Sequence, residues 1–175
     1  MGKKELDQFV RERSKRKEES RKTDWQKIKN EWLEYLNKFY KNVKTWLKDY
    51  EDKGIVTYKF MPIDIYEENI GQYKADKLIL TISNEQVGFE PVGTILIGDA
   101  KGRIDMKGKN GIVKFLLVDE DANGAIVKIS VNTESEKEST PVKWQWKIAT
   151  PPPSVRYLEL NRDSFADAVL DIIND

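Results

Sequence analysis

Aromatic side chains recur every seven residues in the first third of the chain, at Trp25, Trp32, Phe39 and Trp46. Because successive residues of a helix are rotated by about 100°, positions seven apart share one side of it. Thr23 and Gln26 fit a capping box at its start, and Gly54 fits a left-handed residue at its end. The spacing therefore predicts a helix over residues 23–53 that buries an aromatic stripe on a sheet.

A second apolar row runs beside this stripe and consists of Leu33, Tyr40 and Leu47. The two rows together are wider than the apolar stripe of about 100° that a core-facing surface helix carries. The second row therefore lies either under another element of the same chain or on the outside, facing a partner. We take Leu33, Tyr40 and Leu47 as the candidate partner-binding residues.

Beyond Gly54 the apolar residues alternate with a period of two, which indicates strands. The candidate strands are residues 55–66, 72–82, 85–90, 92–98, 102–107, 111–119, 124–133, 140–149 and 155–160. The gaps between them are too short for crossover helices, so strands adjacent in sequence are expected to pair antiparallel as a meander. Asn123-Gly124 is the strongest hairpin signal, and Ser83-Asn84 and Lys109-Asn110 are weaker ones.

A second capping-box pattern at Ser164 and Asp167 predicts a short helix over residues 164–173. The predicted fold class is α+β, with a long N-terminal helix, an antiparallel meander of about eight to nine strands within residues 55–160, and this C-terminal helix. We expect one domain over residues 23–175, preceded by a charged arm at residues 1–22.

The charged arm contains no apolar side chain between residues 11 and 22, so this stretch is either a solvated helix or a mobile segment. The seven basic and three acidic side chains of residues 11–22 give this stretch a net charge of +4. The basic residues are the candidate contacts if the protein binds nucleic acid: Arg11, Arg13, Lys15, Arg16, Lys17, Arg21 and Lys22. Charges of mixed sign more often form a solvated helix face, and no motif for reading bases is present.

The chain has no cysteine and no histidine. Disulfides, thiolate nucleophiles, Ser-His constellations and imidazole zinc sites are therefore excluded, and no cofactor is predicted. No apolar run approaches the roughly 20 residues of a membrane span, and no secretion signal is recognisable, so we expect a cytoplasmic protein that does not bind membranes.

Two carboxylate patterns suggest metal chemistry. Asp119, Asp121 and Asn123 match the first half of a calcium loop, but position twelve is Ser130 instead of a bidentate glutamate. A polar hairpin tip explains the same residues, so no metal site is predicted there.

Asp105 and Lys107, with Asp64 or Asp99 upstream, have the carboxylate-x-lysine spacing of metal-dependent nucleases. That spacing is also common in alternating strands.

The stretch from Phe89 to Asp105, together with the tryptophan-rich helix before it, resembles a family of small uncharacterised bacterial proteins. The resemblance covers the central third of the chain and implies no activity, cofactor or site. We therefore expect a non-catalytic binding module that recognises a protein partner or a second copy of itself. Nucleic-acid association through the arm is the alternative, and a metal-dependent hydrolase at Asp105 and Lys107 is the second alternative.

Overall fold

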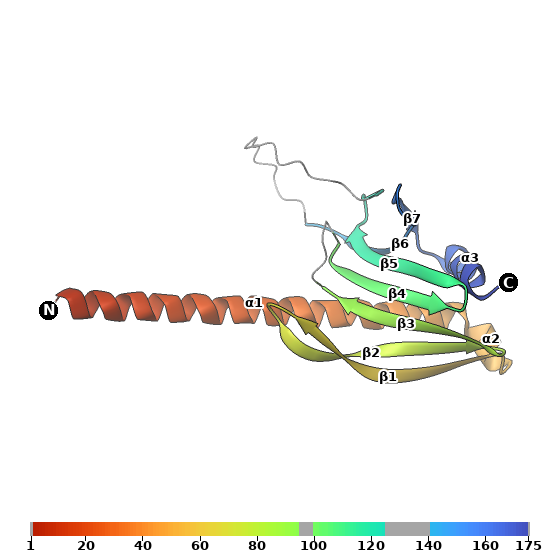
Figure 1. The fold of residues 1–175 in the computed structure, drawn as a ribbon, viewed down its shortest axis with the longest axis horizontal. Coiled ribbons are helices and arrows are strands. Elements are labelled where there is room, and N and C mark those ends of the chain that lie inside the picture. The colour runs from red at the N-terminus through yellow and green to blue at the C-terminus, as the bar shows by residue number, and fades with distance from the viewer. Residues whose placement is uncertain (1, 95–99, 125–140, 175) are drawn as a thin grey trace.

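The computed structural model describes residues 2–94, 100–124 and 141–174, and it has the predicted α+β fold (Figure 1). Along the described residues, a long helix and a five-residue helix are followed by seven antiparallel strands and a short C-terminal helix. The helices are α1 (Gly2–Trp46), α2 (Lys48–Asp52) and α3 (Arg162–Ile173). The strands are β1 (Val56–Glu67), β2 (Gly71–Ile82), β3 (Glu85–Gly93), β4 (Gly102–Gly108), β5 (Gly111–Asp119), β6 (Trp144–Ala149) and β7 (Tyr157–Glu159).

Helix α1 begins at Gly2, so the predicted start at Thr23 is wrong. The Thr23 hydroxyl donates to the Glu19 carbonyl oxygen at 3.0 Å, one turn earlier, which is the bond of a threonine inside a helix. The predicted end at residue 53 is also wrong for this helix, because α1 ends at Trp46 and α2 forms a separate helix after Leu47. Gly54 follows α2 in the predicted left-handed conformation, with φ of +71°. The charged arm is therefore the first half of one continuous helix.

The sheet is the predicted meander, with the order β1-β2-β3-β4-β5-β6-β7. Among the described residues it has seven strands instead of the nine candidates. The predicted strands 85–90 and 92–98 contribute one strand, β3, which continues through Pro91 to Gly93 with a register shift, and no described strand corresponds to 124–133. The predicted strand 124–133 and the end of 92–98 lie largely outside the described residues. Ser83 turns the chain between β2 and β3 with φ of +54°, as the Ser83-Asn84 signal predicts.

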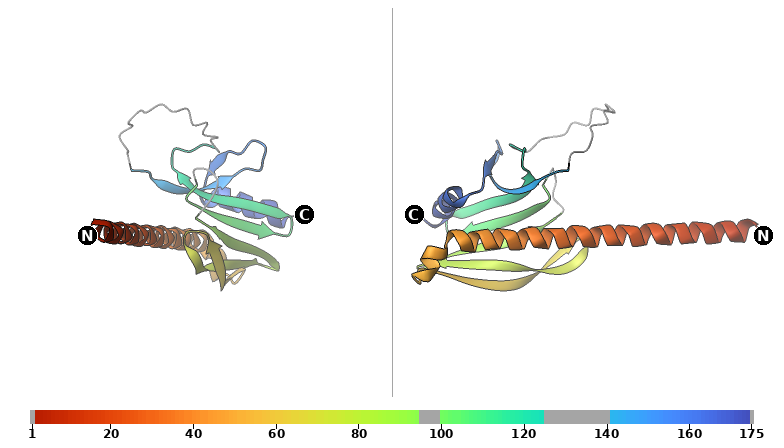
Figure 2. Two further views of the ribbon diagram at one scale, coloured as in Figure 1. Left: turned by 60° about the vertical axis from the view of Figure 1, so that its left-hand side comes forward. Right: turned by 180° about the vertical axis from the view of Figure 1, so that it is seen from behind.

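One face of the sheet carries α1 and α3, and this is where the core lies (Figure 2). Trp32 and Phe39 of the predicted aromatic stripe are 0% exposed, and the Phe39 ring lies 5.0 Å from Phe115 and 5.3 Å from Trp146. Trp25 and Trp46, at the two ends of the stripe, are only half-buried. Aromatic rings at these separations attract one another beyond the effect of area burial alone.

Helix α3 packs beside α1 on the same face of the sheet. The ring of Phe165 stacks on Phe89 at 6.1 Å and lies 5.2 Å from Trp46. The N-cap of α3 is Asn161, whereas the predicted capping box begins at Ser164. The Asn161 side chain accepts a hydrogen bond from the N–H of Ser164, and the Ser164 hydroxyl accepts one from the N–H of Asn161, so the capping box lies three residues earlier than predicted.

Glycine at position 102 lets the Trp32 ring approach the backbone of β4 closely, and substituting this glycine tests the packing. A Cβ atom at residue 102 would lie 2.3 Å from Cζ3 of Trp32, whereas one at residue 111 would lie 3.7 Å from Ile172. We expect Gly102→Ala to lower the free energy of unfolding by about 1–3 kcal/mol through overpacking. Gly111→Ala is the matched control in the next strand and should cost less; urea unfolding of both variants provides the measurement, and equal losses would contradict this packing.

Candidate functional site

The predicted partner-binding row lies against the protein's own sheet. Tyr40 is only 4% exposed, and its hydroxyl donates to the carbonyl oxygen of Asp76 at 2.6 Å. Leu33 and Leu47 are partly buried against the core. The strongly twisted β1-β2 hairpin covers this side of α1, with the Phe60 ring 5.6 Å from that of Tyr40. Tyr40 is therefore a core residue, and the row is not a free docking surface.

Three tyrosines with raised pKa values make the stability of the fold sensitive to alkaline pH. Burial raises the pKa of Tyr40 well above its usual range, and burial together with a hydrogen bond to Glu67 does the same to the pKa of Tyr73. Burial, helped by the charge of Glu51, raises the pKa of Tyr58 to about 12. In all three cases the folded protein holds the proton more tightly than the unfolded chain, in which a tyrosine titrates near 10.

Stability should therefore be lost as the pH rises above about 10, because the unfolded chain then releases protons that the folded protein keeps. Each such tyrosine lowers the free energy of unfolding by about 1.4 kcal/mol per pH unit between its unfolded and folded pKa. Urea unfolding between pH 8 and 11.5 measures this slope. Tyr40→Phe should make it shallower, while Tyr66→Phe, at a side chain that is 77% exposed, should leave it unchanged. An unaltered slope for Tyr40→Phe would contradict the assignment.

Glu67, at the end of β1, is a buried carboxylate that is 7% exposed. Its oxygens accept from the Tyr73 hydroxyl at 2.8 Å, from the Thr94 hydroxyl at 2.9 Å and from the Thr94 N–H. These bonds tie the end of β1 to the residue that follows β3. They satisfy the hydrogen-bonding capacity of the buried carboxylate, so we interpret Glu67 as a structural residue that stabilises the fold.

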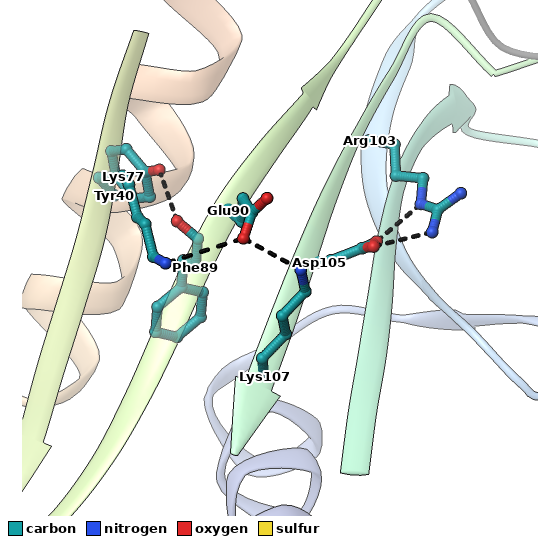
Figure 3. A network of polar contacts seen from close by, with 7 residues as sticks. All are labelled: Tyr40, Lys77, Phe89, Glu90, Arg103, Asp105 and Lys107. Carbon is teal, nitrogen blue, oxygen red and sulfur yellow. Dashed lines mark hydrogen bonds and ion pairs between the residues drawn. The ribbon is translucent and has the colours of Figure 1, made fainter. Parts of the chain in front are cut away.

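The opposite face of the sheet carries no helix among the described residues, and a network of ion pairs lies across it (Figure 3). Glu90 on β3 pairs with Lys107 at 3.0 Å and with Lys77 at 3.7 Å, and the hydrogen bond from Lys107 lowers the pKa of the Glu90 carboxyl. Beside it, Arg103 donates two hydrogen bonds to Asp105, at 2.6 and 2.8 Å. The exposed pair between Glu90 and Lys107 contributes little to stability, whereas Asp105 is a buried carboxylate that needs its partner Arg103.

The network also shows what surrounds the proposed hydrolase residues. Asp105 and Lys107 do lie on the same face, but each is paired with another residue of the network. Asp64 is paired with Lys74 instead, and Asp99 lies outside the described residues. Within residues 2–94, 100–124 and 141–174, no three carboxylates gather in a way that fits a metal ion. Nothing in this geometry favours the hydrolase over ordinary surface ion pairs.

The loop that resembles a calcium site, residues 119–123, binds the side-chain ammonium of Lys147 from the same protein. The ammonium of Lys147, a residue that is 7% exposed, donates to the carbonyl oxygens of Glu120 at 2.5 Å and Ala122 at 2.7 Å. Asp119 accepts from the N–H of Asp121 at 3.1 Å, which is the local turn that an aspartate makes in a loop. Ser130 lies outside the described residues. The loop carbonyls therefore bind a lysine, and this explains the loop without a metal.

The charged arm is exposed along its whole described length, residues 2–22, and projects beyond the end of the sheet (Figures 1 and 2). Near its tip three large apolar side chains lie in water: Leu6 is 60% exposed, Phe9 54% and Val10 53%. The seven basic residues named from the sequence are all exposed as well, and they lie on several sides of the helix. An exposed stretch of helix that carries an apolar cluster is typical of a docking element.

A groove of about 1000 Å³ lies at the other end of the molecule, between α3 and the ends of β5, β6 and β7. It exists because β6 stops at Ala149, opposite Lys114, so that residues 111–113 of β5 have no described strand beside them on that side. Most of its lining is apolar, including Ile112, Leu116, Ile148, Val155, Leu158 and Ala168. Its volume is at the upper end of the range for small-molecule sites.

The rim of this groove is charged. Asp167 and Asp171 line it on the α3 side, while Arg103 and Lys114 line it from the face of the sheet that bears the ion-pair network. Two apolar residues of the lining are also well exposed, Ile112 at 55% and Leu158 at 48%. No sequence pattern predicts this groove, although the spacing of Asp163, Asp167 and Asp171 by four indicates an acidic row on α3.

Comparison of the chain with protein-family models, with curated proteins and with solved structures gave no match. Among the described residues, no helix combines the length and the apolar character needed to cross a bilayer.

Proposed function

We propose that this protein is a non-catalytic interaction module that binds another protein chain through the arm of α1. The observation that carries the proposal is the cluster of Leu6, Phe9 and Val10, three large apolar side chains more than half exposed on a helix that projects into solvent. Exposing them is unfavourable, because each apolar side chain gains about 1.5–3 kcal/mol when it is fully buried. A partner that covers the cluster would recover part of that free energy.

The arm is suited to this role because it is held in the binding conformation before any partner arrives. It continues directly into the half of α1 that is fixed to the sheet by Trp32, Leu36 and Phe39. An amphipathic helix recognises a groove through residues spaced three and four apart, which is the spacing of Leu6, Phe9 and Val10.

A photo-cross-linker placed in the arm tests the proposal in cells of the source organism. Leu6→p-benzoylphenylalanine puts the reactive group within the apolar cluster, and we expect a discrete covalent adduct with one protein species. Lys15→p-benzoylphenylalanine is the matched control, because nine residues rotate the side chain by about 180° to the opposite side of the helix. Adducts from residue 6 and none from residue 15 support the proposal; no adduct from residue 6 contradicts it.

Nucleic-acid binding is the alternative, supported by the exposure of Arg11, Arg13, Lys15, Arg16, Lys17, Arg21 and Lys22. Against it, Glu5, Glu12 and Glu19 recur every seven residues and form an acidic stripe among the basic side chains. We expect duplex DNA to bind no more tightly than about 1 µM at 150 mM salt, as for non-specific contacts. Fluorescence anisotropy with and without residues 2–22 measures this; submicromolar affinity that depends on the arm would favour the alternative.

A further inference from the structure

The groove beside α3 and the tip of the arm have complementary surfaces. The groove offers an apolar floor and a rim that is acidic on its α3 side, with Arg103 and Lys114 on its sheet side, whereas the arm offers an apolar cluster followed by basic side chains. We propose that the groove of one copy of this protein binds the arm of a second copy, so that the chains associate head to tail. This inference rests on the proposed role of the arm, and it names the occupant and the receptor.

The basic side chains that follow the cluster lie on its side of the helix. Arg13 and Lys17 are seven and eleven residues from Leu6, which places them within about 20° of it around the helix axis. Lys15 and Lys22 are nine and sixteen residues away and lie on the opposite side. One face of the arm therefore carries Leu6, then Val10, then two positive charges four residues apart.

Helix α3 presents the matching charges. Asp163, Asp167 and Asp171 are exposed and spaced by four, and none of them forms an ion pair with another described residue. The last turn of α3 contains no basic residue. Asp167 and Asp171 stand at the rim of the groove with the same spacing as Arg13 and Lys17, so a helix laid along α3 can pair both charges while its apolar tip fills the groove.

The arm that fills the groove must come from another copy. The arm and α3 lie at opposite ends of the molecule, and the two views from front and back agree on this (Figures 1 and 2). At 1.5 Å per residue the arm is about 32 Å long, and it points away from its own groove. Because a surface at one end binds a different surface at the other end, the contact is heterologous and adds copies in a row unless a ring closes.

Charge reversal provides the test, with sedimentation velocity over a range of concentrations as the readout. We expect the wild-type mass to rise above the monomer with concentration at about 50 mM salt and to fall back at about 500 mM, because exposed ion pairs are screened. One variant carries Arg13→Glu with Lys17→Glu, and the other carries Asp167→Lys with Asp171→Lys. Each should lose self-association, because its own arm and groove then have like charge.

A mixture of the two reversed variants is the decisive experiment. The acidic arm of the first fits the basic rim of the second, and the basic arm of the second fits the acidic rim of the first. The mixture should therefore recover at least half of the wild-type rise in mass. Lys15→Glu with Lys22→Glu makes the same change in net charge on the far side of the arm and should leave association unchanged. Thermal melts confirm that all of these variants are folded.

Several outcomes would overturn this inference. A wild-type protein that stays monomeric at every concentration, association that survives both reversals, or a mixture that fails to recover association would each do so. The cross-linking experiment at residue 6 distinguishes a failure of self-association from a failure of the proposed function of the arm. An adduct with a different protein, combined with a monomeric pure protein, refutes self-association while the arm remains a binding element.

Discussion

The contact between the aromatic stripe of α1 and one face of the sheet is the interaction on which the rest of the structure depends. A meander of seven strands has two faces, and without α1 the apolar face would be exposed to water. Trp32 and Phe39 fill the space above the middle strands, and the glycine at residue 102 lets the Trp32 ring approach β4 closely. Helix α3 then has a side of α1 and the Phe89 ring to pack against.

The elements of this arrangement that the sequence predicts are those with a repeating local signal. The seven-residue spacing of the aromatic stripe identifies its middle as the buried side of a helix, and the alternation after Gly54 identifies strands in the right order. Local signals also account for the errors. Two strands, 85–90 and 92–98, are predicted where the single strand β3 continues through Pro91 with a register shift. The capping-box pattern at Thr23 predicts a helix start at a residue that lies inside α1.

The site could not be predicted in the same way, because its parts come together only in the folded chain. A wide apolar face on a helix does not reveal whether a twisted sheet covers it, and here the β1-β2 hairpin buries Tyr40. The hydrogen bonds of Glu67 link it to Tyr73 and Thr94, and the groove is lined by residues of β5, β6, β7 and α3. Such groupings depend on strand order and on where β6 ends, which no local pattern encodes.

The helical state of the arm follows from its attachment to the rest of α1. An isolated peptide of this length is marginally helical in water because the first turn is costly to form, whereas adding a residue to an existing helix is close to neutral or favourable. The core at Trp32, Leu36 and Phe39 provides that existing helix, so the arm needs only propagation. Loss of helix should therefore begin at Gly2 and progress towards residue 24. The cluster at Leu6, Phe9 and Val10 lies near the end where the helix frays, so a partner that binds it also stops the fraying. Because the arm is already mostly helical, the conformational entropy lost on binding is small, and more of the free energy of the contact contributes to affinity.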